Sequence, residues 1–520
     1  MVALAERQIA RSAGLLMVGF GLSSLFGLAN RILYTRAFGS GQELDAFFAA
    51  NRVPDILFNL MAGGALASAF LPTFATLLAQ GDRGRAWRMA SGVGSLLILA
   101  LGLAGGLLGV AAPWVVENIL GRGFNDPQQI QLTVSLLRIQ LVAPVIFGIS
   151  GLLMAILNAE QHFLLPALAP TLHWLGWILG TLFLVPRLGI SGLAWGVLLG
   201  AALHLVIQLP GLRRMRPRYA ATLGLKDPSV RMVGRLMAPR LFGVAIVQLN
   251  FLVNVILASG MAVGSLTGIT LGFAIMLMPQ IVIAQAVAIA ALPTFSSQAA
   301  RGELAEMRRS LASTLRGVIF LSLPASLGLI LLRIPLVTLL FQRGEFDTHS
   351  TELVAWAVLW YSTGLVGHAL VEIVSRAFYA LKDTRTPVTV GAAAMALNVV
   401  LSIGLSRLFL RLGWLPHGGL ALANSIATGL EAIALLWLVS RRLEGIEIAR
   451  IRPGIAASLL ATAGMALGLM LWLAVSEGRS AGMVALGGVG LGAAAYWLAS
   501  LGLRSPEARQ LPKLILARRE

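Results

Sequence analysis

The chain of 520 residues is 57% hydrophobic and 12% charged, and its formal net charge is +18. Soluble domains carry about 25% charged residues, so this composition excludes a soluble protein and predicts a polytopic membrane protein. The chain contains no cysteine, which excludes disulfide bonds, thiolate metal sites and a cysteine nucleophile.

Long apolar runs separated by polar loops follow one another along the whole chain. A helix needs about 20 apolar residues to cross a bilayer. Runs of this kind occupy residues 12–36, 46–78, 89–118, 130–158, 164–186, 190–210, 229–258, 265–298, 310–332, 351–381, 387–408, 417–440, 453–476 and 481–503. They predict an all-α polytopic membrane protein with about fourteen transmembrane helices. The first run continues to Arg31 without a small-residue cleavage site, so we expect an uncleaved first span.

Basic residues concentrate in every second loop between these runs. Three arginines lie between residues 83 and 88, and seven basic residues lie between residues 213 and 235. The other loops are poorer in basic residues and contain Arg122, Arg187, Arg343 and Arg479. Cytoplasmic loops of membrane proteins are rich in Lys and Arg, so both termini are predicted to be cytoplasmic. The net positive charge then reflects membrane topology and gives no reason to expect nucleic-acid binding.

Three pairs of motifs recur in the same order at nearly one spacing. The pairs are "LPTF" at 71–74 and 292–295, Pro166 and Pro387, and Gly192 and Gly419, which lie 221, 221 and 227 residues apart. This spacing covers six predicted helices, an even number, so the two copies share one orientation in the membrane. Parallel repeats of this kind are a transporter architecture, with the substrate site between the halves. We therefore predict a six-helix lobe over residues 1–218, a second over 219–445, and two extra helices with a basic cytoplasmic tail over 446–520.

Charged residues interrupt the first two runs, where residues 30–55 read "NRILYTRAFGSGQELDAFFAANRVPD". A charged side chain inside a bilayer usually faces a protein interior or a water-filled cavity. We therefore expect Arg31 to face a polar cavity. Arg52 and Asp55 are three positions apart on one helix face, where they could neutralise each other. Pro54 lies between them and predicts a kink, because it frees backbone groups of the helix.

Three further polar residues complete the candidate site. Asp45 opens the second run, where a carboxylate can either cap the helix or contact the substrate. Asn30 adjoins Arg31, and Asn59 continues the helix face of Asp55. The candidate substrate-binding residues are Asn30, Arg31, Asp45, Arg52, Asp55 and Asn59.

The sequence offers no motif for covalent chemistry. Its six histidines are scattered, with no HExxH pattern and no paired ligand spacing. It also lacks the Walker A pattern, so it hydrolyses no nucleotide by that route. We predict a membrane transporter that is not an enzyme and has no metal or cofactor. The membrane potential or a monovalent cation is the expected energy source.

Five segments carry a resemblance to a known family. They are "FGSGQELDAFFAANRVPD", "GGALASAFLPTF", "MAILNAEQHFLLPALAPTL", "LFQRGEF" and "AFYALKDTRTPV". In this order, between about residues 12 and 440, they resemble the bacterial lipid II flippases, the MurJ (MviN) family of the MATE-like multidrug/oligosaccharidyl-lipid/polysaccharide exporter superfamily. The resemblance implies an inner-membrane protein that moves undecaprenyl-pyrophosphate-linked disaccharide-pentapeptide from the inner to the outer leaflet for peptidoglycan synthesis. It also implies alternating access, with cavity arginines that hold the pyrophosphate.

Most of the family's cavity arginines are missing from this chain. The family pattern has an arginine where this chain has Ser24, paired arginines at Phe58 and Asn59, and another arginine at Ala274. Asp45 is retained, and Arg31 is one place away from the family's arginine. Either Arg31 and Arg52 meet the substrate anion instead, or the chain is a divergent paralogue with another lipid-linked substrate.

Two other functions remain open at this point. One is a cation-coupled exporter of drugs or of another lipid-linked polysaccharide, for which Asp45, Asp55 or Glu431 would bind the coupling cation. The other is a non-transporting scaffold that recruits cell-wall synthesis proteins. The expected partners are a lipid-linked glycan, membrane lipids and, for the scaffold, those proteins.

Overall fold

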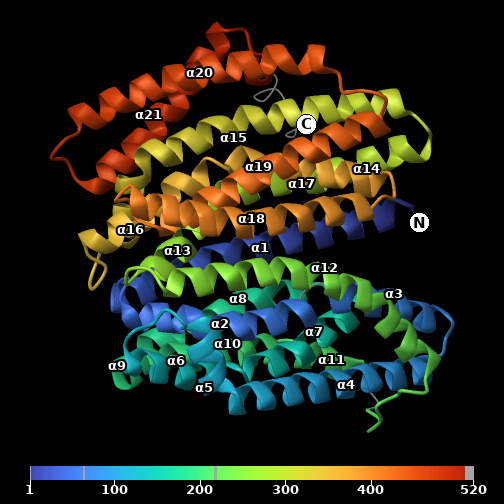
Figure 1. Ribbon diagram of the computed structural model, residues 1–520. Coiled ribbons are helices and arrows are strands. Elements are labelled where there is room, and N and C mark those ends of the chain that lie inside the picture. Colours follow the sequence, from blue (N-terminus) through green and yellow to red (C-terminus); the bar gives the residue numbers. More distant parts are fainter. Residues whose placement is uncertain (1, 62–64, 216–218, 510–520) are drawn as a thin grey trace. The chain divides into compact units, whose positions relative to one another are not determined.

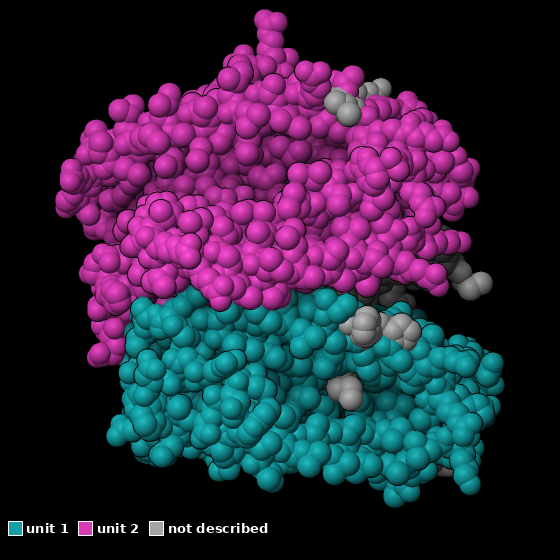
Figure 2. Space-filling view, in the orientation of Figure 1, with its two compact units in different colours: residues 1–263 teal, residues 264–520 magenta. Residues whose placement is uncertain are grey.

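Every regular element in the described residues, which are 2–61, 65–215 and 219–509 of this computed structural model, is a helix (Figure 1). The chain divides after Val263 into two compact units, which Figure 2 colours separately. The all-α fold that the apolar runs predict is confirmed.

Within its described residues, the first unit contains fourteen helical segments, several of which follow one another without a loop and differ only in helical pitch. They are α1 (Val2–Phe38), α2 (Gln42–Met61), α3 (Ala65–Ala79), α4 (Arg83–Val110), α5 (Ala112–Val115), η1 (Val116–Leu120), α6 (Pro127–Gln140), α7 (Ala143–Ala159), α8 (Leu164–Leu179), η2 (Gly180–Leu184), α9 (Val185–Leu188), α10 (Ile190–Val206), α11 (Leu209–Arg214) and α12 (Pro228–Ser259). The segments η1 and η2 are single turns of π-helix.

The second unit is built in the same way from longer helices. They are α13 (Ser265–Gln280), η3 (Ile281–Gln285), α14 (Ala286–Ala300), α15 (Leu304–Phe341), α16 (Thr348–Ser362), α17 (Leu365–Ala380), α18 (Arg385–Arg411), α19 (His417–Arg442), α20 (Ile448–Val475) and α21 (Ala481–Gly502). The last two helices pack against α15. The Tyr496 hydroxyl of α21 donates a hydrogen bond of 2.7 Å to the backbone oxygen of Phe320 in α15.

The predicted spans agree with these helices. Each of the fourteen apolar runs coincides with one helix or with a series of consecutive helices. In the part of the chain that the structure describes, ten helices are long and apolar enough to cross a membrane, or twelve if each of two bent pairs is one span. One such pair is α16 and α17, which meet at an angle of 48°. The chain is therefore a multi-pass membrane protein.

The position of α12 differs from the lobe division drawn from the repeats. That division starts the second lobe at residue 219, whereas α12 belongs to the first compact unit and packs against α2 and α3. A polar contact between α2 and α12, described below, contributes to this packing. The repeat itself is a property of the sequence and stays a prediction.

Aspartate caps mark the starts of several helices. Asp82, Asp126 and Asp347 accept hydrogen bonds from backbone N–H groups in the first turns of α4, α6 and α16. Asp227 does the same for α12. The first N–H groups of a helix have no partner within the helix. A carboxylate there accepts their hydrogen bonds and interacts favourably with the positive end of the helix dipole.

Glycines set the close approach of α8 and η2 to α10. A Cβ atom placed on Gly176 would lie 2.2 Å from the Cα atom of Gly200, and one on Gly180 would lie 2.3 Å from that of Gly196. The glycines recur at four-residue spacing on both segments, which is the small-residue pattern that lets membrane helices pack with their backbones in contact. This crossing fixes the side chains that α8 and α10 direct into the cavity described next.

Candidate functional site

The two arginines proposed for substrate binding lie in the first unit and have different surroundings. Arg31 is half-buried on α1, and its guanidinium carbon lies 5.7 Å from the centre of the Trp174 ring on α8. Arg52 is half-buried on α2 and turns toward α12. Its Nη2 donates to the side-chain oxygen of Gln248 and, at 3.3 Å, to the backbone oxygen of the same residue.

Arg52 does not form the local ion pair that its spacing suggested. Among the described residues, neither Arg31 nor Arg52 lies within ion-pair distance of a carboxylate. The Arg52 guanidinium instead lies 5.1 Å from the centre of the Phe251 ring, so α12 supplies both a carbonyl partner and an aromatic face. A cation held in this way is stabilised by hydrogen bonding and by the ring quadrupole without a direct ion pair.

Asn30 and Asp45 lie in two further environments of the first unit. Asn30 is fully buried, and neither polar atom of its side chain has a hydrogen-bond partner in the described part of the chain. Asp45 is buried in the first turn of α2, where it lines a polar cavity of about 270 Å³ together with Asp126 and Gln129. Its position at a helix N-terminus is electrostatically favourable for a carboxylate.

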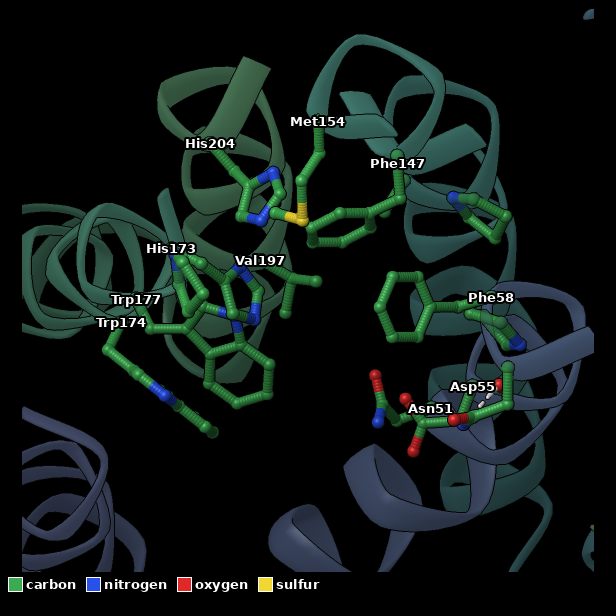
Figure 3. A pocket seen from close by; sticks show the side chains of 16 residues that line it. Asn51, Asp55, Phe58, Phe147, Met154, His173, Trp174, Trp177, Val197 and His204 are labelled. Carbon is green, nitrogen blue, oxygen red and sulfur yellow. Dashed lines mark hydrogen bonds between the residues drawn. The ribbon is translucent and has the colours of Figure 1, made fainter. Parts of the chain in front are cut away.

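Asp55 and Asn59 line a larger cavity of about 460 Å³ inside the first unit (Figure 3). Four helices form its wall, namely α2, α7, α8 and α10. The wall residues are Asn51, Pro54, Asp55, Phe58, Asn59, Ala143, Pro144, Phe147, Gly151, Met154, Pro170, His173, Trp174, Trp177, Val197 and His204. Helix α2 continues through Pro54, which places Asn51, Asp55 and Asn59 on one helix face at successive turns.

Aromatic rings form much of the cavity wall. Phe58 and Phe147 meet edge to face with their ring centres 4.8 Å apart. Trp174 and Trp177 lie 5.7 Å apart, and His173 lies 5.0 Å from Phe147. Figure 3 shows His173 and Trp177 across the cavity from Phe58 and Asp55. The same cavity therefore presents ring faces on one side and a carboxylate with ring faces on the other.

A buried hydrogen-bond chain holds one histidine of this wall in place. The Oγ atom of Ser150 lies 2.6 Å from Nδ1 of His204 and accepts a hydrogen bond of 2.7 Å from the side-chain amide of Gln208. The Ser150 hydroxyl also lies 3.1 Å from the backbone oxygen of His204, to which it can donate. These contacts from Ser150 and Gln208 fix the position of the His204 ring at the cavity wall.

Within residues 2–61, 65–215 and 219–509, no group of three or more His, Asp or Glu side chains could hold a metal ion. The cavity of Figure 3 has one acidic residue in its wall. Its single carboxylate, its amides and its rings suit non-covalent binding of a small molecule.

Comparison with known proteins decides the family. The model of the family described as "Lipid II flippase MurJ" matches residues 34–485. The chain belongs to the MurJ family. A Burkholderia cenocepacia protein named "Lipid II flippase MurJ" is 32% identical over 465 residues, which are 88% of each chain. The resemblance drawn from the five motifs is thus confirmed.

Solved structures show that the chain has the fold of this family and superfamily. The structure described as "Lipid II flippase MurJ, inward closed conformation" matches with a TM-score of 0.79 at 23% identity, over 94% of this chain and 98% of that one. An inward-facing multidrug resistance MATE family transporter of the MOP superfamily matches with a TM-score of 0.67 at 16% identity, over 82% and 98%. These two likenesses concern the fold alone.

Sequence reasoning did not propose the aromatic and histidine residues that line this cavity. The signal was present as "HWLGW" at 173–177, which puts His173, Trp174 and Trp177 on neighbouring turns of an apolar run. A second histidine, His204, interrupts a later run. Their meeting at one cavity depends on the α8–α10 crossing, which a scan for local ligand spacing does not detect.

Proposed function

We propose that this chain is a flippase that moves lipid II from the inner to the outer leaflet of the bacterial inner membrane. The observation that carries this proposal is the family match over residues 34–485, together with the 32% identity to a protein named "Lipid II flippase MurJ" over 88% of each chain. Membership of a flippase family makes the chain a membrane transporter rather than an enzyme. Its substrate class is a lipid-linked glycan.

The physical difficulty of the reaction lies in the headgroup. A pyrophosphate and its sugars must cross hydrocarbon while the prenyl tail stays in the lipid. Arginine side chains lower this barrier because a guanidinium can donate two parallel hydrogen bonds to phosphate oxygens. We assign this role to Arg31 and Arg52, and the absence of a carboxylate partner for either of them among the described residues supports the assignment.

The Arg52 surroundings add a second support. Its Nε atom is buried and has no hydrogen-bond partner in the residues the structure describes, although Nη2 contacts Gln248. An unsatisfied guanidinium N–H in an apolar span is costly. A phosphate oxygen would satisfy it, so Arg52 is suited to exchange its Gln248 contact for the substrate during transport.

Energy for the step is proposed to come from the membrane. Moving one negative charge outward across an inside-negative membrane is favoured by about 2.3 kcal/mol per 100 mV. A monovalent cation is the second possible source of energy. Rocking of two parallel repeats, with both termini in the cytoplasm, would expose the headgroup to each leaflet in turn.

A replacement assay tests the proposal directly. The gene is placed in cells depleted of their own lipid II flippase, and lipid II in the outer leaflet is measured together with growth. We expect the chain to restore both. Correct membrane insertion without any outer-leaflet lipid II would contradict the assignment of this substrate.

A further inference from the structure

The cavity of about 460 Å³ in the first unit contains one carboxylate and no Lys or Arg among the described residues of its wall. Asp55 is its one acidic wall residue, and no lysine or arginine belongs to the wall. Arg52, which lies three residues away on α2 and outside the wall, attracts the Asp55 charge but donates its hydrogen bonds to Gln248 of α12. In the described part of the chain, no Lys or Arg forms an ion pair with Asp55.

The rings of the wall favour a positive ligand as well. Phe58, Phe147, Trp174 and Trp177 all border the cavity. Aromatic faces carry partial negative charge, and a cation within about 6 Å of a ring centre is attracted to it, most strongly when water is excluded. Aromatic cages of this kind recognise ammonium groups whose charge is spread over methyl or methylene groups.

The other titratable groups of the wall are two histidines. The Nδ1 atom of His204 lies 2.6 Å from the Ser150 hydroxyl oxygen, and His173 is an edge-on neighbour of Trp177 at 5.8 Å. In their neutral form, these imidazoles present no repulsive charge to a cation. Beyond the wall, Arg31 lies against the Trp174 ring and is not a wall residue itself.

We propose that this cavity binds a small organic cation with an ammonium centre. Asp55 supplies the counter-charge, and the Phe58, Trp174 and Trp177 rings surround the alkyl groups. The volume of about 460 Å³ is within the range of small-molecule sites, about 300–1,000 Å³. Neither arginine assigned to the phosphate is a wall residue of this site, and the proposal goes beyond the proposed flippase activity.

The test uses the purified full-length protein in lipid nanodiscs and two ligands of equal shape. Radiolabelled choline is the cation, and 3,3-dimethyl-1-butanol is its neutral isostere, used as a competitor. We expect saturable choline binding, with the neutral analogue at least about tenfold weaker, because it lacks both the ion pair and the cation–ring attraction. Equal competition by the two compounds would overturn the proposal, as would the absence of choline binding.

Variants locate the binding within the protein. Asp55→Asn keeps the shape of the side chain and is expected to weaken choline binding about tenfold or more. Glu117→Gln is the matched control, since Glu117 is an exposed acidic residue of η1 outside the cavity. Unchanged choline affinity in Asp55→Asn would also overturn the proposal.

An aromatic pair of variants keeps the test informative if Asp55→Asn does not fold. Trp174→Leu removes a ring of the wall, whereas Trp114→Leu removes a ring that is 61% exposed and lies outside the cavity. Only Trp174→Leu should weaken choline binding, and equal affinities would contradict the site. Lipid II flipping by the wild-type chain in the replacement assay is a separate measurement, so either proposal can fail without the other.

Discussion

Arg52 shows how a single side chain can join segments far apart in the sequence. Its guanidinium donates hydrogen bonds to Gln248, which is 196 residues away, and forms no ion pair with Asp55 three residues away, although the two charges attract each other. Spacing along a helix predicts which residues share a face, but it does not show what a neighbouring helix offers. Here α12 offers a carbonyl oxygen, a side-chain oxygen and the Phe251 ring.

Substitution of Gln248 measures how much its contact with Arg52 contributes to the free energy of unfolding. Gln248→Leu changes the side-chain volume little but removes the acceptor oxygen. It therefore leaves the half-buried Arg52 guanidinium with fewer hydrogen-bond partners. We expect a loss of about 1.5–3 kcal/mol in the free energy of unfolding, the usual range for a hydrogen bond to a charged group. Chemical unfolding in detergent, followed by tryptophan fluorescence, measures it.

The control for this variant is Gln131→Leu, because Gln131 is an exposed residue of α6 whose side chain makes no described hydrogen bond. Its unfolding free energy should stay within about 0.5 kcal/mol of the wild type. If Gln248→Leu behaves like this control, the Arg52 contact contributes nothing to the stability of the first unit.

Asp383 gives a pH-dependent prediction outside the membrane-spanning helices. It precedes α18 and accepts hydrogen bonds from the backbone N–H of Thr386 at 3.0 Å and from its hydroxyl at 2.7 Å. The Thr386 N–H and hydroxyl, with a smaller contribution from Arg442, hold the pKa of the Asp383 carboxyl below its usual range. The stabilisation is present above the unfolded-state pKa of about 3.9 and disappears as the pH falls through the lower folded-state value.

Thermal unfolding between neutral pH and about pH 3 tests this linkage. The wild type should lose stability more steeply on acidification than Asp383→Asn, in which the residue cannot titrate. Parallel acid profiles for the two proteins would show that the carboxylate at this turn does not contribute to the pH dependence.

At the scale of elements, the crossing of α8 and η2 with α10 determines the shape of the cavity. Four glycines allow the backbones to touch, and the histidines and tryptophans on either side of them reach the same space. The apolar runs predicted these helices well, because the thickness of the bilayer fixes their length. They contained no information on which turn of one helix meets which turn of another.

Gly176→Ala tests the crossing. The added methyl group would lie 2.2 Å from the Gly200 Cα atom, so the helices must separate. Overpacking of this kind costs about 1–3 kcal/mol and should lower the thermal stability of the protein and its binding of choline. Gly102→Ala is the control, since a methyl group there meets no atom within 4 Å. Similar melting temperatures for the two variants would rule out a tight crossing at Gly176.

On the scale of the whole molecule, the sequence was sufficient for the fold class, the multi-pass character and the family. Hydropathy gave the helices, and five ordered motifs gave the resemblance that the match over residues 34–485 confirms. The sequence predicted the residues of the candidate site less well. Asp55 and Asn59 line the larger cavity, Asp45 lines a smaller one, and Asn30 is fully buried. The aromatic wall was missed because it forms from four helices whose packing depends on tertiary contacts.

The role of the arginines in transport is a prediction for the whole molecule. In the replacement assay, Arg31→Gln combined with Arg52→Gln should abolish the rescue, because no guanidinium then remains at these positions to meet the pyrophosphate. Arg36→Gln is the matched control on α1, since Arg36 is an exposed residue in the last turn of the helix. Membrane abundance of each variant is measured to exclude failed insertion.

The amount of lipid II in the outer leaflet of flippase-depleted cells is the measurement that tests the account most directly. With equal amounts of protein in the membrane, we predict that the wild type and Arg36→Gln restore outer-leaflet lipid II and that the Arg31→Gln/Arg52→Gln double variant does not. Full restoration by the double variant would contradict the account, because it would show that the headgroup crosses without either arginine.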